Sequence, residues 1–241
     1  MTGETTASVA TSNGYEIQNP TEKMDAQQLR AMLSDEFHIG GSSSRERLEQ
    51  LKQLSHEGIA IMLEAINKGL QGSEDSLMNH DSAMRLFDAA GNVAAVTLAP
   101  EDRYDVFVSM IDGIKAAPDD INPARVADTL ALGTVLLHPF HDGNGRTARV
   151  VASLFRESYD NAAEYADDFQ VLTESRDAVR ARGGFVINGY TPHLPEGADQ
   201  SNPDDVKTYL HTLLTEEGSD SLYTGCYGKV PLKIGAVEGG H

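Results

Sequence analysis

The sequence predicts an all-α fold, a helical bundle that carries one small β-hairpin. Apolar residues recur at the three-and-four spacing of an α-helix along most of the chain after residue 25. Helix-start signals agree with this pattern, above all Asn122 followed by Pro123, whose missing amide costs nothing at the first helical position. The run 93–98 is short, partly β-branched and bounded by turn-forming residues, so it reads as a strand or as one half of a hairpin.

The chain divides by composition into three parts. Residues 1–25 are rich in Thr, Ser, Asn and Glu, and we expect them to form a disordered arm. Residues 26–190 form the predicted helical core, since 241 residues with 40% hydrophobic content can bury one main core. Residues 191–241 begin with a linker rich in Gly, Pro, Asn and Asp, and continue as a C-terminal helix and a tail.

Each helix is predicted from an apolar stripe and its boundary residues. The first begins with a capping box of Ser43 and Glu46, and its stripe continues as one long amphipathic helix to about Gly69. A stripe from Phe107 to Ile114 marks another helix, which stops near Pro118. The remaining predicted helices cover approximately residues 74–87, 123–137, 145–155, 162–180 and 204–216.

Charge and cysteine content exclude several classes of protein. The chain has 19 basic and 37 acidic residues, a formal net charge of −18, which would repel a phosphate backbone, so nucleic acid is not an expected partner. Cys226 is the only cysteine, so no internal disulfide can form, which fits a reducing cytosol. Neither a signal peptide nor a membrane-spanning stretch is predicted. We expect a cytoplasmic protein, with export as an effector left open.

The run from His138 to Arg149, His-Pro-Phe-His-Asp-Gly-Asn-Gly-Arg-Thr-Ala-Arg, has the composition of a phosphate-binding loop. Gly143 and Gly145 flank Asn144 immediately before a predicted helix, where backbone amides and the helix dipole favour an anion. Two arginines three residues apart on that helix add positive charge. The expected ligand is therefore a nucleotide.

Two further residues of the run suggest the chemistry of group transfer. Asp142 lies at the mouth of the predicted phosphate cradle, and a carboxylate beside phosphates commonly holds Mg²⁺. His138 precedes it by four residues and can take a proton from an attacking hydroxyl near neutral pH. Phe140 alternates with these polar groups and is expected to anchor the loop in the core.

The complete run resembles the signature of the Fic family, His-Pro-Phe-x-Asp/Glu-Gly-Asn-Gly-Arg-x-x-Arg, at every specified position. The resemblance extends by order of elements over about residues 70–184 and implies a Fic-type helical bundle with a β-hairpin flap. It also implies protein adenylyltransferase activity, in which AMP moves from ATP to a Ser, Thr or Tyr hydroxyl of a target protein or of this chain itself.

The resemblance assigns a role to each residue of the motif. His138 is implied as the general base, and Asp142 as the residue that holds Mg²⁺ across the α- and β-phosphates. The remaining implied contacts to ATP come from the anion hole of Gly143, Asn144 and Gly145, from Arg146 at the phosphates and from Arg149 at the γ-phosphate, with Phe140 packed beneath.

The flap and an inhibitory helix are further implied features. The flap corresponds to residues 93–98, and Val96 and Thr97 are expected to align the target by main-chain pairing, with an ordinary surface hairpin as the alternative. Many relatives pair an inhibitory glutamate with the second arginine of the motif, here Arg149. Glu217 and, less favoured, Glu57 are the candidates, although neither has a hydroxyl residue four positions earlier and both could be ordinary surface glutamates. If neither glutamate is inhibitory, the enzyme is expected either to have a separate antitoxin-like regulator or to be constitutively active.

Two alternative functions stay open. Related proteins transfer UMP, phosphocholine or a phosphoryl group, and the intact Gly143 and Gly145 favour AMP over the last two but do not exclude UMP. From a different functional class, the chain could be a catalytically silent module that senses ATP and presents its flap to a partner. The presence of His138 beside an intact cradle argues against this second alternative.

Overall fold

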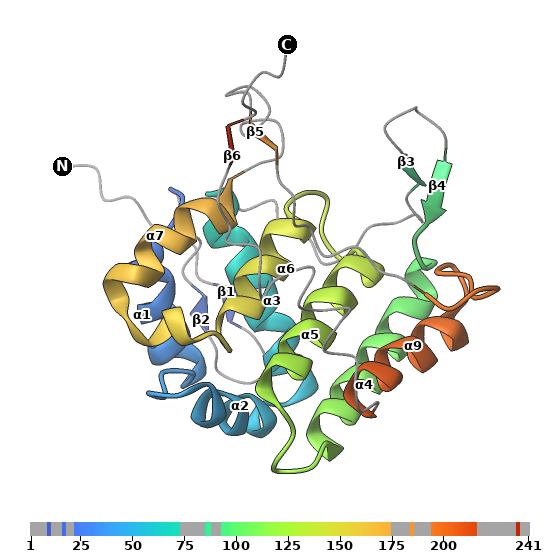
Figure 1. Ribbon diagram of the computed structural model, residues 1–241, viewed down its shortest axis with the longest axis horizontal. Coiled ribbons are helices and arrows are strands. Elements are labelled where there is room, and N and C mark those ends of the chain that lie inside the picture. Colours follow the sequence, from blue (N-terminus) through green and yellow to red (C-terminus); the bar gives the residue numbers. More distant parts are fainter. Residues whose placement is uncertain are drawn as a thin grey trace.

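The computed structural model describes residues 9–10, 16–17, 22–72, 85–87, 93–174, 184–185, 194–215 and 235–236. Helices dominate this part of the chain and pack side by side as a bundle (Figure 1). The helices are α1 (Ala26–Phe37), α2 (Ser44–Gln53), α3 (His56–Gln71), α4 (Pro100–Ala116), α5 (Pro123–Leu137), α6 (Asn144–Ser153), α7 (Ala162–Thr173) and α9 (Pro203–Thr215), with a 3₁₀ turn η1 (Glu157–Asp160) before α7. The predicted all-α class is confirmed.

The described strands form three short antiparallel pairs. β3 (Arg85–Phe87) pairs with β4 (Val93–Val96) as a hairpin that projects beyond the helices (Figure 1). The other pairs are β1 (Val9–Ala10) with β2 (Glu16–Ile17), and β5 (Gly184–Phe185) with β6 (Gly235–Ala236). The first of these pairs lies within residues 1–25, predicted as a disordered arm, most of which falls outside the described residues.

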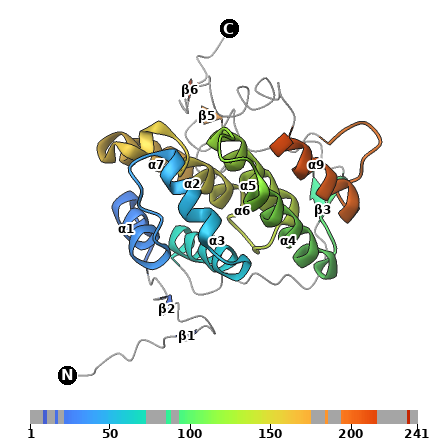
Figure 2. The same cartoon turned by 90° about the horizontal axis from the view of Figure 1, so that it is seen from below.

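Helix α5 occupies the centre of the bundle. Its side chains from Val126 to Leu137 are almost all buried, and these include the polar side chains of Asp128, Thr129 and Thr134. It packs against α6, α4 and α9, and Figure 2 shows it between α6 on one side and α4 and α9 on the other. The end of α5 therefore carries the chain from the centre of the bundle to the half-buried His138.

The single long helix predicted from Ser43 to about Gly69 is wrong. Leu54 has an extended backbone, and Ser55 caps a new helix by accepting the N–H of Gly58 at 3.0 Å, so the segment forms α2 and α3. Ser43 caps α2 as predicted, but the carboxylate of Glu46 accepts from Ser42 instead of closing the capping box. The sequence pattern did not show the break at Leu54, because α2 and α3 each bury an apolar face and their apolar residues form one continuous stripe in the sequence.

Other boundaries also differ from the sequence predictions. Arg85–Phe87, expected at the end of a helix, is strand β3, because it pairs with β4 across the hairpin, while residues 73–84 lie outside the described part. The predicted strand 93–98 ends at Val96. The predicted helix 162–180 is described as far as Thr173. The last predicted helix is α9, which begins one residue earlier than predicted, at Pro203, and is described as far as Thr215.

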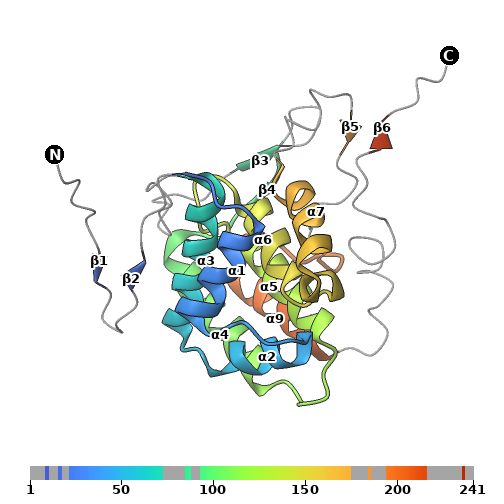
Figure 3. The ribbon, with the colours of Figure 1, turned by 90° about the vertical axis from the view of Figure 1, so that its left-hand side faces the viewer.

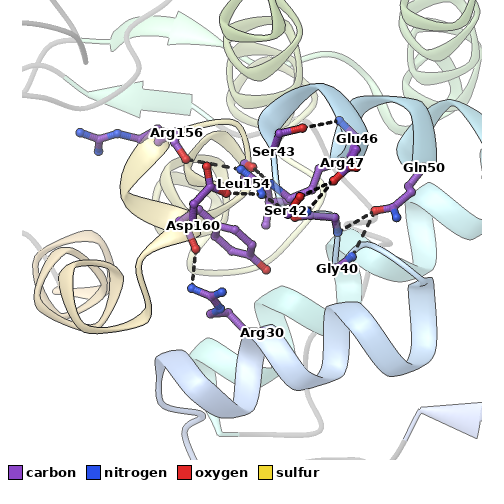
Figure 4. A network of polar contacts seen from close by, with 12 residues as sticks. Arg30, Gly40, Ser42, Ser43, Glu46, Arg47, Gln50, Leu154, Arg156 and Asp160 are labelled. Carbon is purple, nitrogen blue, oxygen red and sulfur yellow. Dashed lines mark hydrogen bonds and ion pairs between the residues drawn. The ribbon is translucent and has the colours of Figure 1, made fainter.

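A network around Arg47 fastens α1 and α2 to the segment after α6 (Figure 4). The Arg47 side chain is fully buried and donates to the carbonyl oxygens of Leu154 and Gly41 and to Asp160 Oδ1 at 2.5 Å. Arg30 donates to the carbonyl oxygen of Tyr159, and both guanidinium groups stack 4.6 Å from the Tyr159 ring centroid. The closeness of α1 to α7 is visible from the side in Figure 3.

Among the described residues, no helix has the length and apolarity that crossing a membrane requires.

Candidate nucleotide-binding site

His138 terminates α5 in the left-handed helical conformation, with φ 47° and ψ 55°. Its N–H donates to the carbonyl oxygen of Thr134 at 3.2 Å, and the residue is half-buried. Among the described residues only His38, also at a helix end, shares a positive φ without being glycine. This conformation, uncommon for a residue with a side chain, turns the chain sharply out of α5 and directs it toward α6.

The turn between His138 and α6 is held by Asn144 and Phe140. The Asn144 side chain accepts the N–H of Phe140 at 3.0 Å and donates to its carbonyl oxygen at 2.7 Å. Phe140 is fully buried, as predicted for an anchor. Since the side-chain amide of Asn144 is committed to this clamp, only its backbone N–H remains suited to the anion contact predicted for this residue.

Helix α6 begins without a capping side chain. Gly143 occupies the N-cap position with φ 81°, and no side-chain hydrogen bond caps this terminus within the described structure, in contrast to α1, α2, α3, α5 and α7. A Cβ at Gly143 would stand 2.5 Å from Gln71 Nε2 and 2.8 Å from Asn67 Nδ2. Glycine is therefore required, and the first-turn amides of Asn144, Gly145 and Arg146 are oriented as an anion site needs.

The C-terminal end of α3 supports the loop, which sequence reasoning missed. Asn67 is 1% exposed, and its Nδ2 donates to the carbonyl oxygen of Asp142 at 3.0 Å and to Thr147 Oγ1 at 2.9 Å. Gln71 Oε1 accepts from Arg146 Nη2 at 3.1 Å. The available signal was a polar residue, Asn67, inside the apolar stripe of α3, but its partners are 75 and 80 positions away in sequence.

Asp142 and Arg146 form an ion pair at the mouth of the loop. Asp142 Oδ2 lies 2.9 Å from Arg146 Nη2, and Oδ1 accepts the N–H of Gly143 at 2.6 Å. The Asp142 side chain is 80% exposed. The Arg146 side chain is only 12% exposed and also contacts Gln71, so it is the exposed Asp142 carboxylate that can turn to a ligand at small cost.

Arg149 is buried and connects α6 to the end of α7. Its Nε donates to the carbonyl oxygen of Leu172 at 2.9 Å and its Nη2 to that of Glu174 at 3.1 Å. A cation at the last carbonyls of a helix is favourable because those groups carry the negative end of the helix dipole. Nη1 lies 3.8 Å from the position that a Cβ on Gly145 would take, so the same guanidinium also borders the loop.

The predicted flap is a hairpin. Arg85 is the partner of Val96 and Leu86 that of Ala95, with an irregular register before Phe87. Val96 is half-buried, whereas Thr97, just beyond β4, is 2% exposed. The Thr97 side chain thus faces the protein, and only main-chain groups of this segment are suited to the predicted pairing.

Of the two inhibitory candidates, Glu57 lies within the described residues and Glu217 does not. Glu57 is in the first turn of α3, about ten residues or roughly 15 Å along the helix from Asn67. Glu217 lies outside the described residues, and helix α9 before it packs on α4 and α5, whereas Arg149 contacts the end of α7. The inhibitory roles of both glutamates stay predictions.

Comparisons with known proteins identify the domain. The Fic/DOC family model matches residues 48–156, which include the loop from His138 to Arg149 and its support on α3. Similar solved structures include a Fic domain containing signaling protein from Bacteroides thetaiotaomicron, 18% identical, with a TM-score of 0.35 over 79% of this chain and 76% of that chain. No curated protein matches the chain. Residues 48–156 are thus identified as a Fic/DOC family domain.

Proposed function

We propose that this protein is an adenylyltransferase that moves AMP from ATP to a Ser, Thr or Tyr hydroxyl of a target protein. One observation supports the proposal. His138 ends α5, and the N-terminus of α6, which no side chain caps, begins six residues later at Asn144, so the proposed base is close in sequence to the proposed anion site.

The reaction needs few groups from the protein. His138 accepts the proton of the target hydroxyl as the hydroxyl oxygen attacks the α-phosphorus of ATP. A phosphorus–oxygen bond to the target forms while the bond between the α-phosphorus and the bridging oxygen breaks, and pyrophosphate leaves. The products are the AMP-modified target and pyrophosphate, with the proton on His138. Catalysis here consists of positioning and charge stabilisation, as in phosphoryl transfer generally.

The polyphosphate is proposed to lie at the start of α6. Backbone amides of the first turn point along the helix axis and hold the anion where the helix dipole favours it. Arg146, held beside this terminus by its contacts to Asp142 and Gln71, is proposed to contact the phosphates as well. Arg149 supports this arrangement from the side of Gly145 and α7, and its role at the γ-phosphate is part of the proposal.

The residues at the loop fit Mg²⁺ held together with substrate. Asp142 supplies an exposed carboxylate, and the described residues contain no cluster of three His, Cys, Asp or Glu that would form a protein cage. Mg²⁺ usually keeps several waters and binds through one or two carboxylates plus phosphates, so a single carboxylate is the expected donor. Asp142 would hold the ion, which supplies positive charge to neutralise the phosphates.

Label transfer from nucleotides tests the proposal. The purified chain is incubated with a cell lysate and Mg²⁺, and with ATP labelled at the α- or at the γ-phosphate, or with UTP labelled at the α-phosphate. We expect protein label, on a target or on the chain itself, from α-labelled ATP alone. Label from γ-labelled ATP would indicate phosphoryl transfer instead, and stronger label from UTP would indicate uridylyl transfer.

A His138→Ala variant separates catalysis from binding. It should lose transfer yet bind ATP with Mg²⁺ as the wild type does in isothermal titration calorimetry, because no backbone amide of α6 changes. Wild-type ATP binding without transfer to any protein would favour the alternative of a silent ATP-sensing module. Cytoplasmic location and an antitoxin-like regulator are part of the same proposal, and co-purification from the native cell tests the regulator.

A further inference from the structure

A cavity of about 470 Å³ lies between the N-terminal halves of α3 and α4, with the end of α5 beside it. Its walls are mainly apolar and include Ala60, Leu63, Phe107 and Leu137. We call it the α3–α4 pocket. Pockets of roughly 300–1,000 Å³ are large enough for specific ligands, and this one can accept a whole aliphatic or aromatic side chain.

Two residues that line the α3–α4 pocket connect it to the candidate site. Pro139 directly follows His138, the proposed base. Pro100 begins α4, and only three residues separate it from Val96, the last residue of β4. The pocket therefore adjoins both the proposed base and the strand proposed to align the target.

The rim of the α3–α4 pocket has the character of a protein-binding surface. Tyr104 lines the pocket and is 73% exposed, the one large exposed hydrophobic side chain found among the described residues. Aromatic side chains beside an apolar pocket are typical of binding hot spots. Arg103 also lines the pocket but is 8% exposed, whereas Glu57 at the rim and Glu101 in the first turn of α4 are exposed, in a chain of net charge −18. Such a rim favours a basic partner.

We propose that the α3–α4 pocket is a specificity subsite for the target protein. It takes one large aliphatic or aromatic side chain from the extended segment that carries the acceptor hydroxyl, in a stretch with Lys or Arg. This inference rests on the proposed function. A segment paired with β4 places every second side chain on one face, so the anchoring side chain stands about two or four residues from the hydroxyl.

Peptide binding to the complete chain tests the subsite without catalysis. The probes are fluorescent synthetic peptides with a central Ser, flanking Lys, and either Leu or Ala about two or four residues from the Ser. We expect the Leu peptide to bind at least about tenfold more tightly by fluorescence anisotropy, because burial of a Leu side chain provides that difference.

Two variants locate the effect. Ala60→Phe fills the α3–α4 pocket and should abolish the preference for Leu, whereas Ala124→Phe, the same change at an exposed position at the opposite end of α5, should retain it. Tyr104→Ala should weaken binding of the Leu peptide. Because the Tyr104 side chain is exposed, this variant should fold normally, so it tests the subsite even if Ala60→Phe does not fold.

The outcomes distinguish the subsite from the proposed function. Equal binding of both peptides, no binding of either, or an unchanged preference in folded Ala60→Phe or in Tyr104→Ala would overturn the subsite. A preference for Leu without transfer of label from α-labelled ATP would support the subsite and count against the adenylyltransferase. Transfer to peptides with no preference for Leu would support the transferase and overturn the subsite.

Discussion

Asn67 provides the sharpest test of how α3 supports the loop. An Asn67→Leu change keeps the side chain near its present size and removes the donor to the Asp142 carbonyl oxygen and to Thr147 Oγ1. The Asn67 side chain and its hydrogen bond to Thr147 Oγ1 are buried, so water does not replace the lost donor there. Each unsatisfied buried group costs about 1–3 kcal/mol, and two groups lose their donor. The Thr147 hydroxyl can reorient, which reduces the sum, so we expect a loss of roughly 2–4 kcal/mol in the free energy of unfolding.

Thermal unfolding measures this loss. For a chain of this length, about 1 kcal/mol shifts Tm by roughly 2–4 °C, so Asn67→Leu should melt about 4–16 °C below the wild type. Circular dichroism or calorimetry gives Tm, and titration calorimetry gives the affinity for ATP with Mg²⁺, which should fall because the start of α6 loses its support.

The control is Gln170→Leu, at an exposed position of α7, which should change stability by no more than about 0.5 kcal/mol. A Tm for Asn67→Leu within the range of this control would refute the reasoning, since the two hydrogen bonds would then contribute nothing. Reduced stability with unchanged ATP affinity would show that Asn67 supports the fold but not the phosphate site.

Three further predictions concern other parts of the fold. Gly143→Ala should weaken ATP binding in titration calorimetry, because a Cβ at φ 81° meets Asn67 and Gln71; unchanged affinity would contradict the role of this glycine. Arg47→Met should lower the free energy of unfolding in urea by about 3–5 kcal/mol, since it leaves Asp160 and three carbonyl oxygens without their donor, and a loss below about 1 kcal/mol would show that the network is dispensable. Burial raises the pKa of the Tyr159 hydroxyl, so as pH rises this hydroxyl ionises in the unfolded chain before it ionises in the folded chain. The contribution of Tyr159 to the free energy of unfolding is therefore complete below about pH 10 and is lost between that pH and the raised pKa of the folded state. Melting curves from pH 8 to 11 should show less alkaline destabilisation in Tyr159→Phe than in the wild type.

The sequence by itself determined the features that depend on neighbouring residues. The helical class follows from periodic apolar stripes, and the start of α5 from Asn122 and Pro123, because caps and stripes act over a few residues. The loop from His138 to Arg149 was also identified from sequence, because its backbone amides and charges come from one continuous segment. The position of the β4 strand was predicted because turn-forming residues bound it.

The tertiary structure decided what depends on contacts between distant segments. The break at Leu54 and the strand β3 needed partners elsewhere in the fold, and the stripe alone did not show them. Asn67 supports the loop only because α3 packs beside α6, and the Arg149 guanidinium contacts the end of α7 for the same kind of reason. A buried hydrogen bond gains its value from removal of water by packing, which no local sequence pattern encodes. The motif thus supplies the groups of the proposed chemistry, and the packing of α3, α5 and α7 around it determines where these groups stand.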